Sequence, residues 1–145
     1  MITRIVVDTN VVMKWIPGKD ESEVDTARKI YSVIKTNGIE MWAPEYMLVE
    51  CLQIFLRKRQ LKPEVAMDGL SQIEGCGLGF VPLGAEDFED ISDISFKFGQ
   101  SVYDAIFLHA AKQKECQLVT FDEKVYQRCD WAVSPKEFLK SEVVE

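Results

Sequence analysis

Residues 5–10 read IVVDTN: three β-branched apolar residues, followed directly by Asp8 and by the polar pair Thr9 and Asn10. Short apolar runs of this kind recur along the chain, and stretches with helical periodicity separate them. Strands that alternate with helices predict an α/β fold, with a central, mainly parallel sheet and helices on both of its faces. Ligands gather at the carboxyl ends of the strands in such sheets. Asp8 therefore lies where a functional site is expected.

The other expected elements follow from the same alternation. Strands are predicted at residues 5–7, 39–43, 117–120 and 131–133, with one more between 78 and 83. Helices are predicted at residues 22–37, 45–59, 63–74, 85–98, 102–114 and 122–129. Gly38 supplies a left-handed helix stop, and Pro44 is well placed to open the helix that follows it. No repeat and no Pro-, Gly- or Ser-rich linker divides the chain, so we expect one domain over residues 1–145.

The charge balance restricts how the chain can bind nucleic acid. Its 145 residues include 17 Lys and Arg against 24 Asp and Glu, a formal net charge of −7. This sign argues against binding through bulk positive charge. A nucleic-acid enzyme stays open, because a bound metal ion supplies positive charge locally. No apolar stretch approaches the ~18 residues of a membrane span, and Asp8 interrupts the first apolar run too early for a signal peptide. A cytoplasmic protein is expected.

Cysteine and histidine usage excludes several kinds of site. The four cysteines form no CxxC pair, which favours reduced and mostly buried thiols; they are Cys51, Cys76, Cys116 and Cys129. The single histidine, His109, excludes a His-pair zinc site. A Ser-His-Asp hydrolase would depend on His109 alone. Its surroundings, AIFLHAAK, favour packing inside a helix instead.

Four segments carry the candidate chemistry: VVDTN at 6–10, PEYMLVE at 44–50, SVYDA at 101–105 and TFD at 120–122. Each is weak by itself, because an apolar run followed by an aspartate is common. Together, in this order and with a parallel α/β pattern between them, they resemble the PIN-domain ribonuclease family. The likeness is strongest to the VapC-type toxins of prokaryotic toxin–antitoxin pairs, and it spans nearly the whole chain.

This resemblance implies a set of site residues and partners. The four acidic catalytic positions of the family fall on Asp8, Glu50, Asp104 and Asp122, of which Asp8, Asp104 and Asp122 match metal ligands. Supporting polar positions fall on Thr9, Asn10, Ser101 and Thr120. The family implies Mg²⁺- or Mn²⁺-dependent hydrolysis of single-stranded RNA segments, often in structured RNA of the tRNA or rRNA class. It also implies a homodimer and a cognate antitoxin protein, whose C-terminal segment binds over the active site.

The residue types suit this chemistry. Mg²⁺ and Mn²⁺ are hard cations that prefer carboxylate and water oxygens. One ion can activate a water molecule, and a second can stabilise the leaving oxygen of a phosphoryl displacement. Such a site needs carboxylates and no histidine. A bound metal also reverses the sign of an acidic pocket toward RNA, which reconciles the net charge with an RNA substrate.

Three of these acids also have purely structural interpretations. Asp8 could end a strand and cap a turn. Ser101 and Asp104 fit a helix capping box, and an acid in a first helical turn can still face a pocket. Asp122 could cap the short helix that follows the last long strand. The match to the family favours the site interpretation of Asp8 and Asp122, and the two interpretations of Asp104 are compatible.

The second acid of the set is the least settled. Glu50 lies away from the apolar stripe of its predicted helix and could be a solvated surface residue. Glu45 competes with it, but it occupies a first helical turn, where the helix dipole alone favours an acid. The spacing from Pro44 favours Glu50 within the family pattern.

Other charged residues are interpreted more simply. The acids between residues 86 and 93 are expected to form a solvated helix face. The strongest positive cluster consists of Arg57, Lys58, Arg59 and Lys62. These cations fit a helix C-terminus somewhat better than they fit phosphate contacts. Lys14 and Trp15 follow Asp8 and could meet an RNA backbone or base, which the sequence leaves open.

Alternatives from other classes fit less well. A haloacid-dehalogenase-like phosphatase needs a second aspartate where this chain has Asn10. A response-regulator receiver needs an acidic pair near the end of the first strand. A non-catalytic PIN scaffold has no reason to keep four carboxylates. A PIN nuclease of RNA maturation without an antitoxin stays open, and the small size of the chain favours the toxin.

Overall fold

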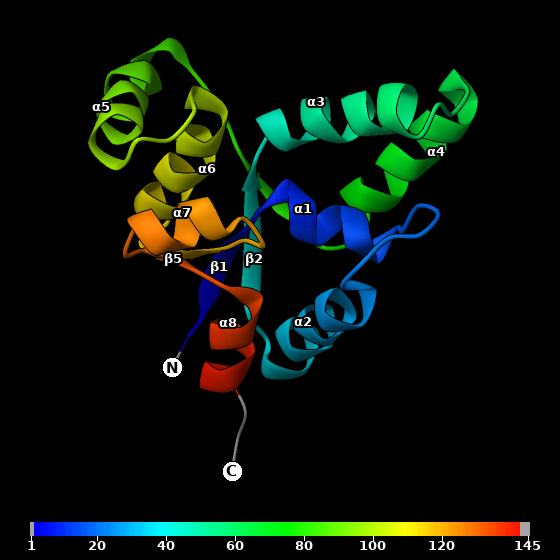
Figure 1. The fold of residues 1–145 in the computed structure, drawn as a ribbon, viewed down its shortest axis with the longest axis horizontal. Coiled ribbons are helices and arrows are strands. Elements are labelled where there is room, and N and C mark those ends of the chain that lie inside the picture. Colours follow the sequence, from blue (N-terminus) through cyan, green and yellow to red (C-terminus); the bar gives the residue numbers. More distant parts are fainter. Residues whose placement is uncertain (1, 143–145) are drawn as a thin grey trace.

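The computed structural model describes residues 2–142 (Figure 1). Its sheet has five strands, all parallel to their neighbours, in the order β3-β2-β1-β4-β5. The strands are β1 (Arg4–Val7), β2 (Glu40–Pro44), β3 (Gly79–Val81), β4 (Gln117–Val119) and β5 (Ala132–Val133). The predicted α/β class with a parallel sheet is confirmed. The predicted domain boundaries, 1–145, include residues 1 and 143–145, which lie outside the described residues.

Helices cover both sides of the sheet. They are α1 (Thr9–Val12), α2 (Val24–Asn37), α3 (Tyr46–Gln53), α4 (Pro63–Glu74), α5 (Phe88–Phe98), α6 (Val102–Gln113), α7 (Glu123–Arg128) and α8 (Pro135–Glu142). Figure 1 shows α5, α6 and α7 on one side of the strands and α1 to α4 on the other. Helix α6 packs directly against β1, β2 and β4. The sheet is therefore enclosed, as a parallel sheet requires.

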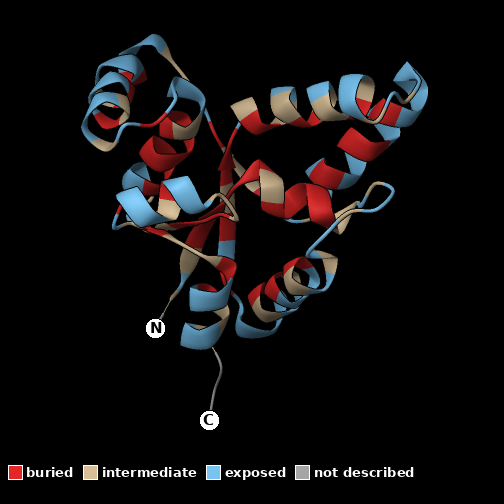
Figure 2. Cartoon of the chain, in the orientation of Figure 1, coloured by how far each residue is buried: buried red, intermediate tan, exposed pale blue. Residues whose placement is uncertain are grey.

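The centre of the sheet is the most buried part of the molecule. In β1, Ile5, Val6 and Val7 are each at most 1% exposed, because the strand has a neighbour on both edges and helices over both faces. Figure 2 shows buried residues along the strands and on the helix faces that turn toward them. The continuous apolar run that predicted this strand is the pattern of a strand buried on both faces.

Local signals set most helix ends. Gly38 ends α2 in the left-handed conformation, with φ of 65°, as predicted. Helix α4 has the predicted bounds, with Pro63 at its first position. Pro44, however, is the last residue of β2 and does not open the next helix. The helix expected to reach Arg59 consists of α3 followed by a π-helical turn, Ile54–Lys58.

Two helices were missing from the prediction. Asp8 caps α1 through a hydrogen bond from the Thr9 N–H, and a 3₁₀ turn, Met13–Trp15, continues it. Four residues are too few to show helical periodicity, so this helix had no sequence signal. Helix α8 did have one: Ser134 precedes Pro135 and its hydroxyl accepts a bond from the Glu137 N–H, which is half of a capping box.

His109 packs inside α6 as expected, but its partners are acids. Its Nδ1 lies 2.6 Å from Asp90 Oδ2, and its Nε2 lies 3.2 Å from Asp87 Oδ1. The run at 86–93 is therefore not a uniform solvated face, since Asp87 is buried and Asp90 half-buried, whereas Glu89 is exposed. A bond from the Gly84 N–H, followed by the contact with His109, holds the pKa of Asp87 below its usual value.

The four cysteines carry free thiols, as expected. Cys51 and Cys129 are buried, Cys76 and Cys116 are half-buried, and no disulfide joins these four described residues. Between residues 2 and 142 no helix has the length and apolar character of a membrane span.

Candidate active site at the carboxyl ends of β1 and β4

The residues that follow β1 and β4 meet at one point of the sheet. Val7 pairs with Val119, and the Asp8 N–H donates to the Val119 carbonyl at 3.0 Å. Asp8 and Thr120, the residues that directly follow these two strands, are therefore side by side. The strand order changes direction between β1 and β4. From β1 the chain first adds β2 and β3 on one edge of the sheet, and it then returns to add β4 and β5 on the other edge. Such a switch point is where open α/β sheets bind ligands.

Hydroxyl and amide groups hold the first two acids in place. Asp8 Oδ1 accepts from the Thr9 N–H at 2.8 Å, and Asp8 Oδ2 accepts from the Thr120 hydroxyl at 2.7 Å. The Thr9 hydroxyl donates to Glu50 Oε1 at 2.7 Å. Thr9 thus joins the end of β1 to α3, across 41 positions of sequence. These bonds place Glu50 beside Asp8.

Thr120 is the centre of a second set of bonds. Its side chain is fully buried, and its Oγ1 accepts from Asn10 Nδ2 at 3.1 Å and from the Asp122 N–H at 3.0 Å. Asn10 Oδ1 in turn accepts from the Phe121 N–H at 3.1 Å. The polar residues after Asp8 therefore fix the loop that carries Asp122.

Asp104 and Asp122 combine a capping position with a place in the pocket. The Ser101 hydroxyl accepts from the Asp104 N–H at 3.1 Å at the start of α6. Asp122 Oδ1 accepts from the Lys124 N–H at 3.1 Å at the start of α7. Both acids nevertheless line the same hollow as Asp8 and Glu50. The structural and the site interpretations of these two residues are compatible.

All four acids predicted from the sequence line one hollow of about 1150 Å³. Asp8 and Asp122 follow the ends of β1 and β4, Glu50 lies in the second turn of α3, and Asp104 lies in the first turn of α6. Glu45 lies outside it, and its Oε1 accepts from the Leu83 N–H at 3.0 Å. The structure therefore brings together Asp8, Glu50, Asp104 and Asp122 and leaves the competing glutamate elsewhere.

Burial and mutual repulsion change the acidity of this group. Burial raises the pKa of Asp8 from 3.8 to about 7, and the charges of Glu50 and Asp104 add to the effect, against the opposing bond from Thr120. The pKa of Glu50 is raised by burial and by the charge of Asp104. The pKa of Asp104 is also raised, first by burial and then by Asp122. The arrangement disfavours the charged forms and favours a compensating cation.

The donor chemistry of the pocket fits a hard divalent cation. Four carboxylates line one hollow, and two threonine side chains orient two of them. Over residues 2–142, no three His, Cys, Asp or Glu side chains stand close enough together to hold an ion as they are placed. Ion binding would thus require some carboxylates to turn toward a common centre. Oxygen ligands of this type suit Mg²⁺ or Mn²⁺, whereas zinc sites usually include His or Cys ligands, and none of the described residues of these two types lines this hollow.

Two cations that line the hollow, Arg59 and Lys14, bind backbone carbonyl groups of the protein itself. Arg59 donates to the carbonyl oxygens of Ile16 and Met13, at 2.6 and 3.2 Å. Lys14 donates to the Ser22 carbonyl at 2.7 Å, and both cations pair with Glu21. Arg59 therefore fastens the loop at residues 16–22, a role that neither sequence interpretation included.

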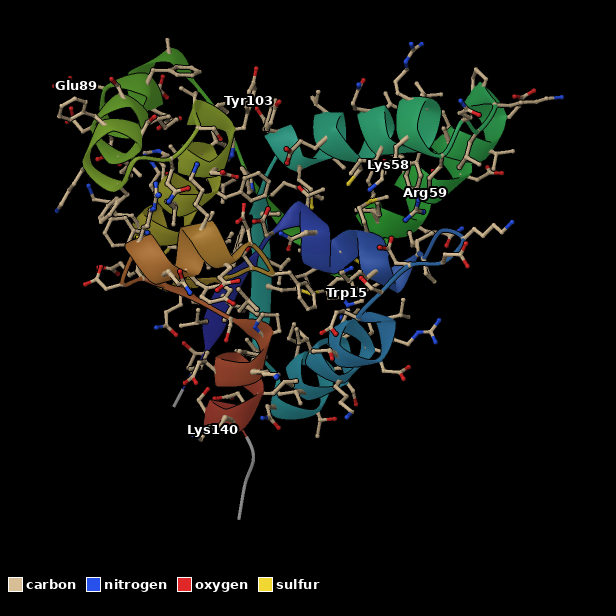
Figure 3. The ribbon with its side chains drawn as sticks, viewed as in Figure 1. Trp15, Lys58, Arg59, Glu89, Tyr103 and Lys140 are labelled. Atoms are coloured by element: carbon tan, nitrogen blue, oxygen red, sulfur yellow. The ribbon has the colours of Figure 1, made fainter. Side chains whose placement is uncertain are left out.

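Two residues next to these cations in the sequence differ in exposure. The Trp15 ring nitrogen donates to the Ala27 carbonyl at 2.8 Å, so this residue supports α2. Lys58 is exposed and lines the acidic hollow (Figure 3). Lys58, a member of the positive cluster at residues 57–62, is therefore placed to contact a phosphate group.

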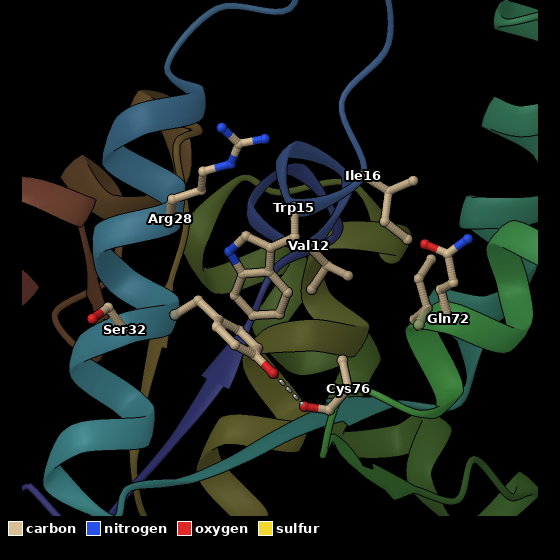
Figure 4. A pocket seen from close by; sticks show the side chains of 9 residues that line it. Val12, Trp15, Ile16, Arg28, Ser32, Gln72 and Cys76 are labelled. Atoms are coloured by element: carbon tan, nitrogen blue, oxygen red, sulfur yellow. Dashed lines mark hydrogen bonds between the residues drawn. The ribbon is translucent and has the colours of Figure 1, made fainter.

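A second, apolar hollow adjoins the acidic one. It has a volume of about 340 Å³ and lies between α2, α4 and the 3₁₀ turn (Figure 4). Trp15 and Tyr31 form one wall, and the Tyr31 hydroxyl donates to the Cys76 carbonyl at 3.3 Å. Ile16 and Gln72 line both hollows. An apolar surface is therefore continuous with the edge of the acidic pocket.

Comparisons with known proteins agree on the fold. A family model described as "PIN domain" matches residues 5–130. VapBC2 from Rickettsia felis, solved bound to a DNA fragment from their promoter, is similar with a TM-score of 0.69 and 16% identity over 90% of this chain and 98% of that chain. A toxin–antitoxin complex from Klebsiella pneumoniae gives 0.66 and 16% over 90% and 97%. A protein from Pyrobaculum aerophilum gives 0.66 and 14% over 98% and 96%. Comparison with curated protein sequences yields no match.

Proposed function

This chain belongs to the PIN-domain family, and from this premise we propose that it is a metal-dependent endoribonuclease and the toxin of a VapBC-type toxin–antitoxin pair. The observation that carries the proposal is the meeting of Asp8, Glu50, Asp104 and Asp122, from four separate segments, in one pocket at the switch point of the sheet. The fold likeness to a VapBC protein and to a toxin–antitoxin complex supports the toxin assignment. The proposed substrate is RNA of the tRNA or rRNA class.

In this proposal Asp8, Asp104 and Asp122 hold Mg²⁺ or Mn²⁺, and Glu50 completes the catalytic set. A bound ion of this kind lowers the pKa of a water molecule and neutralises charge on the reacting phosphate. The chain itself supplies orientation. Thr120 and Thr9 hold oxygens of Asp8 and Glu50, so these carboxylates keep their places despite repelling each other.

The direct test is incubation of the purified protein with total RNA, with Mn²⁺ or with EDTA, followed by mapping of the RNA ends. Discrete new ends that require Mn²⁺ support the proposal. If no RNA is cut at any Mg²⁺ or Mn²⁺ concentration, and expression does not slow growth, the non-catalytic scaffold becomes the better interpretation.

The two glutamates near the start of α3 offer a matched pair of variants. Glu50→Gln is expected to reduce cleavage by about tenfold to a hundredfold, as outer residues of a metal site do. Glu45→Gln should leave the rate nearly unchanged, because Glu45 lies outside the pocket. The measurement is the initial rate of cleavage at saturating Mn²⁺. Equal losses in both variants would show that Glu50 has no special role.

The proposed antitoxin should cover both hollows. An apolar helix would fit the apolar hollow beside Trp15 and Tyr31, and a basic side chain would reach the acids through the shared edge at Ile16 and Gln72. A cation placed among these carboxylates forms charge-assisted hydrogen bonds and replaces the metal. The homodimer implied by the family stays a prediction, to be checked by sedimentation.

Antitoxin and metal are therefore expected to compete. The antitoxin is to be taken from the neighbouring gene, and its affinity measured by calorimetry at increasing Mn²⁺. We expect the apparent dissociation constant to rise in proportion to Mn²⁺ once the metal site is filled. Binding that is indifferent to Mn²⁺ would place the contact away from the acids.

A further inference from the structure

Two tyrosine rings stack on each other where α3 and α6 begin. The centroids of Tyr46 and Tyr103 are 5.8 Å apart, and their planes differ by 19°. Figure 3 shows Tyr103 in the space between the starts of these two helices. The same two helices carry Glu50 and Asp104. The pair thus connects α3 and α6, the two helices that supply Glu50 and Asp104 to the pocket.

The stacking leaves one ring face available. Tyr103 is 58% exposed and Tyr46 is half-buried. Because Tyr46 covers one face of the Tyr103 ring, the exposed surface is the opposite face and the edge. Among the described residues, neither hydroxyl has a hydrogen-bond partner. The Tyr103 ring is thus held in a fixed orientation by the stack and still presents an open face to solvent.

This open face lies beside the acidic pocket. Tyr46 is four residues before Glu50 on α3, a spacing that puts two side chains on one helix face about 5–6 Å apart at Cβ. Tyr103 directly precedes Asp104, which lines the pocket. Burial raises the pKa of Tyr46, and the charge of Glu50 raises it further, in keeping with this proximity. The two rings do not line the hollow itself, but they lie next to it on the helices that carry Glu50 and Asp104.

We propose that Tyr103, held in place by Tyr46, is a stacking platform for an unpaired base of the RNA next to the cleaved phosphate. The inference rests on the proposed function and deepens it, because it names the residue that would hold a base of the RNA beside the acids. Stacking on an aromatic ring needs a base whose face is open, which the interior of a duplex does not offer. It also tolerates any sequence, because every base has an aromatic face.

The net charge strengthens this assignment. With −7 overall, the chain gains little affinity for an RNA backbone from its charge. A stacking contact is neutral and does not depend on positive charge. It therefore supplies affinity that does not depend on the net charge of the protein.

The test separates binding from cleavage. A dye-labelled, random-sequence, single-stranded RNA of twelve nucleotides is titrated with protein by fluorescence anisotropy, with Ca²⁺ in place of Mg²⁺ and Mn²⁺ and with gels to verify that the RNA stays intact. We compare wild type with Tyr103→Leu and Tyr103→Trp. Phe96→Leu is the matched control, since Phe96 is 92% exposed on α5. Circular dichroism verifies folding of each variant.

We expect Tyr103→Leu to weaken single-strand binding by roughly tenfold or more, the range found for loss of one base stack. Tyr103→Trp should keep wild-type affinity, Phe96→Leu should change nothing, and binding of a duplex of equal length should be the same for all variants. In cleavage assays Tyr103→Leu should raise KM with little change in kcat.

Several outcomes would overturn the platform. One is that Tyr103→Leu binds single strands as tightly as wild type, or loses as much affinity for duplex RNA as for single strands. Another is that wild type binds no single strands. A third is that Tyr103→Leu converts a dimer to a monomer, which would assign the ring to contact with a second copy of the chain. The result is distinguishable from failure of the proposed function. If wild type binds single strands through Tyr103 but cuts none, the platform stands and the nuclease proposal fails.

Discussion

Replacing Asp8 by Asn is expected to abolish RNA cleavage and, at the same time, to stabilise the metal-free protein above pH 7. Mutation of a residue that supports the ligands of a metal site typically lowers activity by about 10–100-fold. Loss of a proposed ligand should therefore lower the cleavage rate by more than about 100-fold. The stability effect has a separate cause. Burial raises the pKa of Asp8 to about 7 from 3.8, so charging this carboxyl opposes folding.

The sign of the pH dependence follows from these two values. Between about pH 4 and pH 7 the folded protein binds more protons than the unfolded chain, so the free energy of unfolding falls as the pH rises through that window. Above about pH 7 the full cost is present, on the order of 4 kcal/mol at 1.36 kcal/mol for each pH unit. Asn cannot be charged and should escape this cost.

The variant should therefore be more stable than wild type at pH 8 and less stable at pH 5. At pH 5 the wild-type carboxyl is already neutral, while the variant weakens the bond from Thr120 and loses about 1 kcal/mol. The measurement is urea unfolding in EDTA from pH 4 to 8. A variant that is less stable than wild type at every pH would mean that Asp8 is a structural cap and would remove the basis of the metal proposal.

Mn²⁺ is expected to raise the free energy of unfolding of wild type by about 2–3 kcal/mol at a hundredfold excess over its dissociation constant. The effect should be larger at pH 8 than at pH 5, because the ion and protons compete for the same carboxylates. Asp104→Asn should lose most of this stabilisation. The measurement is the melting temperature with Mn²⁺ and with EDTA.

Glu89→Gln provides the control, because Glu89 is an exposed acid that points away from the pocket on α5 (Figure 3). It changes the net charge by the same amount as Asp104→Asn. Its response to Mn²⁺ should equal that of wild type. If Mn²⁺ stabilises all three proteins equally, the ion binds elsewhere and these acids are not its ligands.

Most of the elements could be predicted in order because they are specified by local sequence. Helix α4 has a proline at its start and apolar residues at helical spacing, and its predicted bounds match. The strand at β1 was evident from three β-branched residues. Helix α1 was not predictable in this way, since its four residues form around the Asp8 cap and the packing of β1 against β4.

The sequence by itself determined the α/β class, the chain order of the strands and of the helices other than α1 and α8, and the segments that carry the four acids. These features depend on residues within a few positions of one another, and periodicity and capping record such relations directly. Only the tertiary structure decided that Glu50 and not Glu45 joins Asp8, that Asp8 is buried enough to titrate near pH 7, and that Tyr46 stacks on Tyr103. The physical reason is separation along the chain. The bond between Thr120 and Asp8 spans 112 positions, and no local pattern encodes the strand register that closes it.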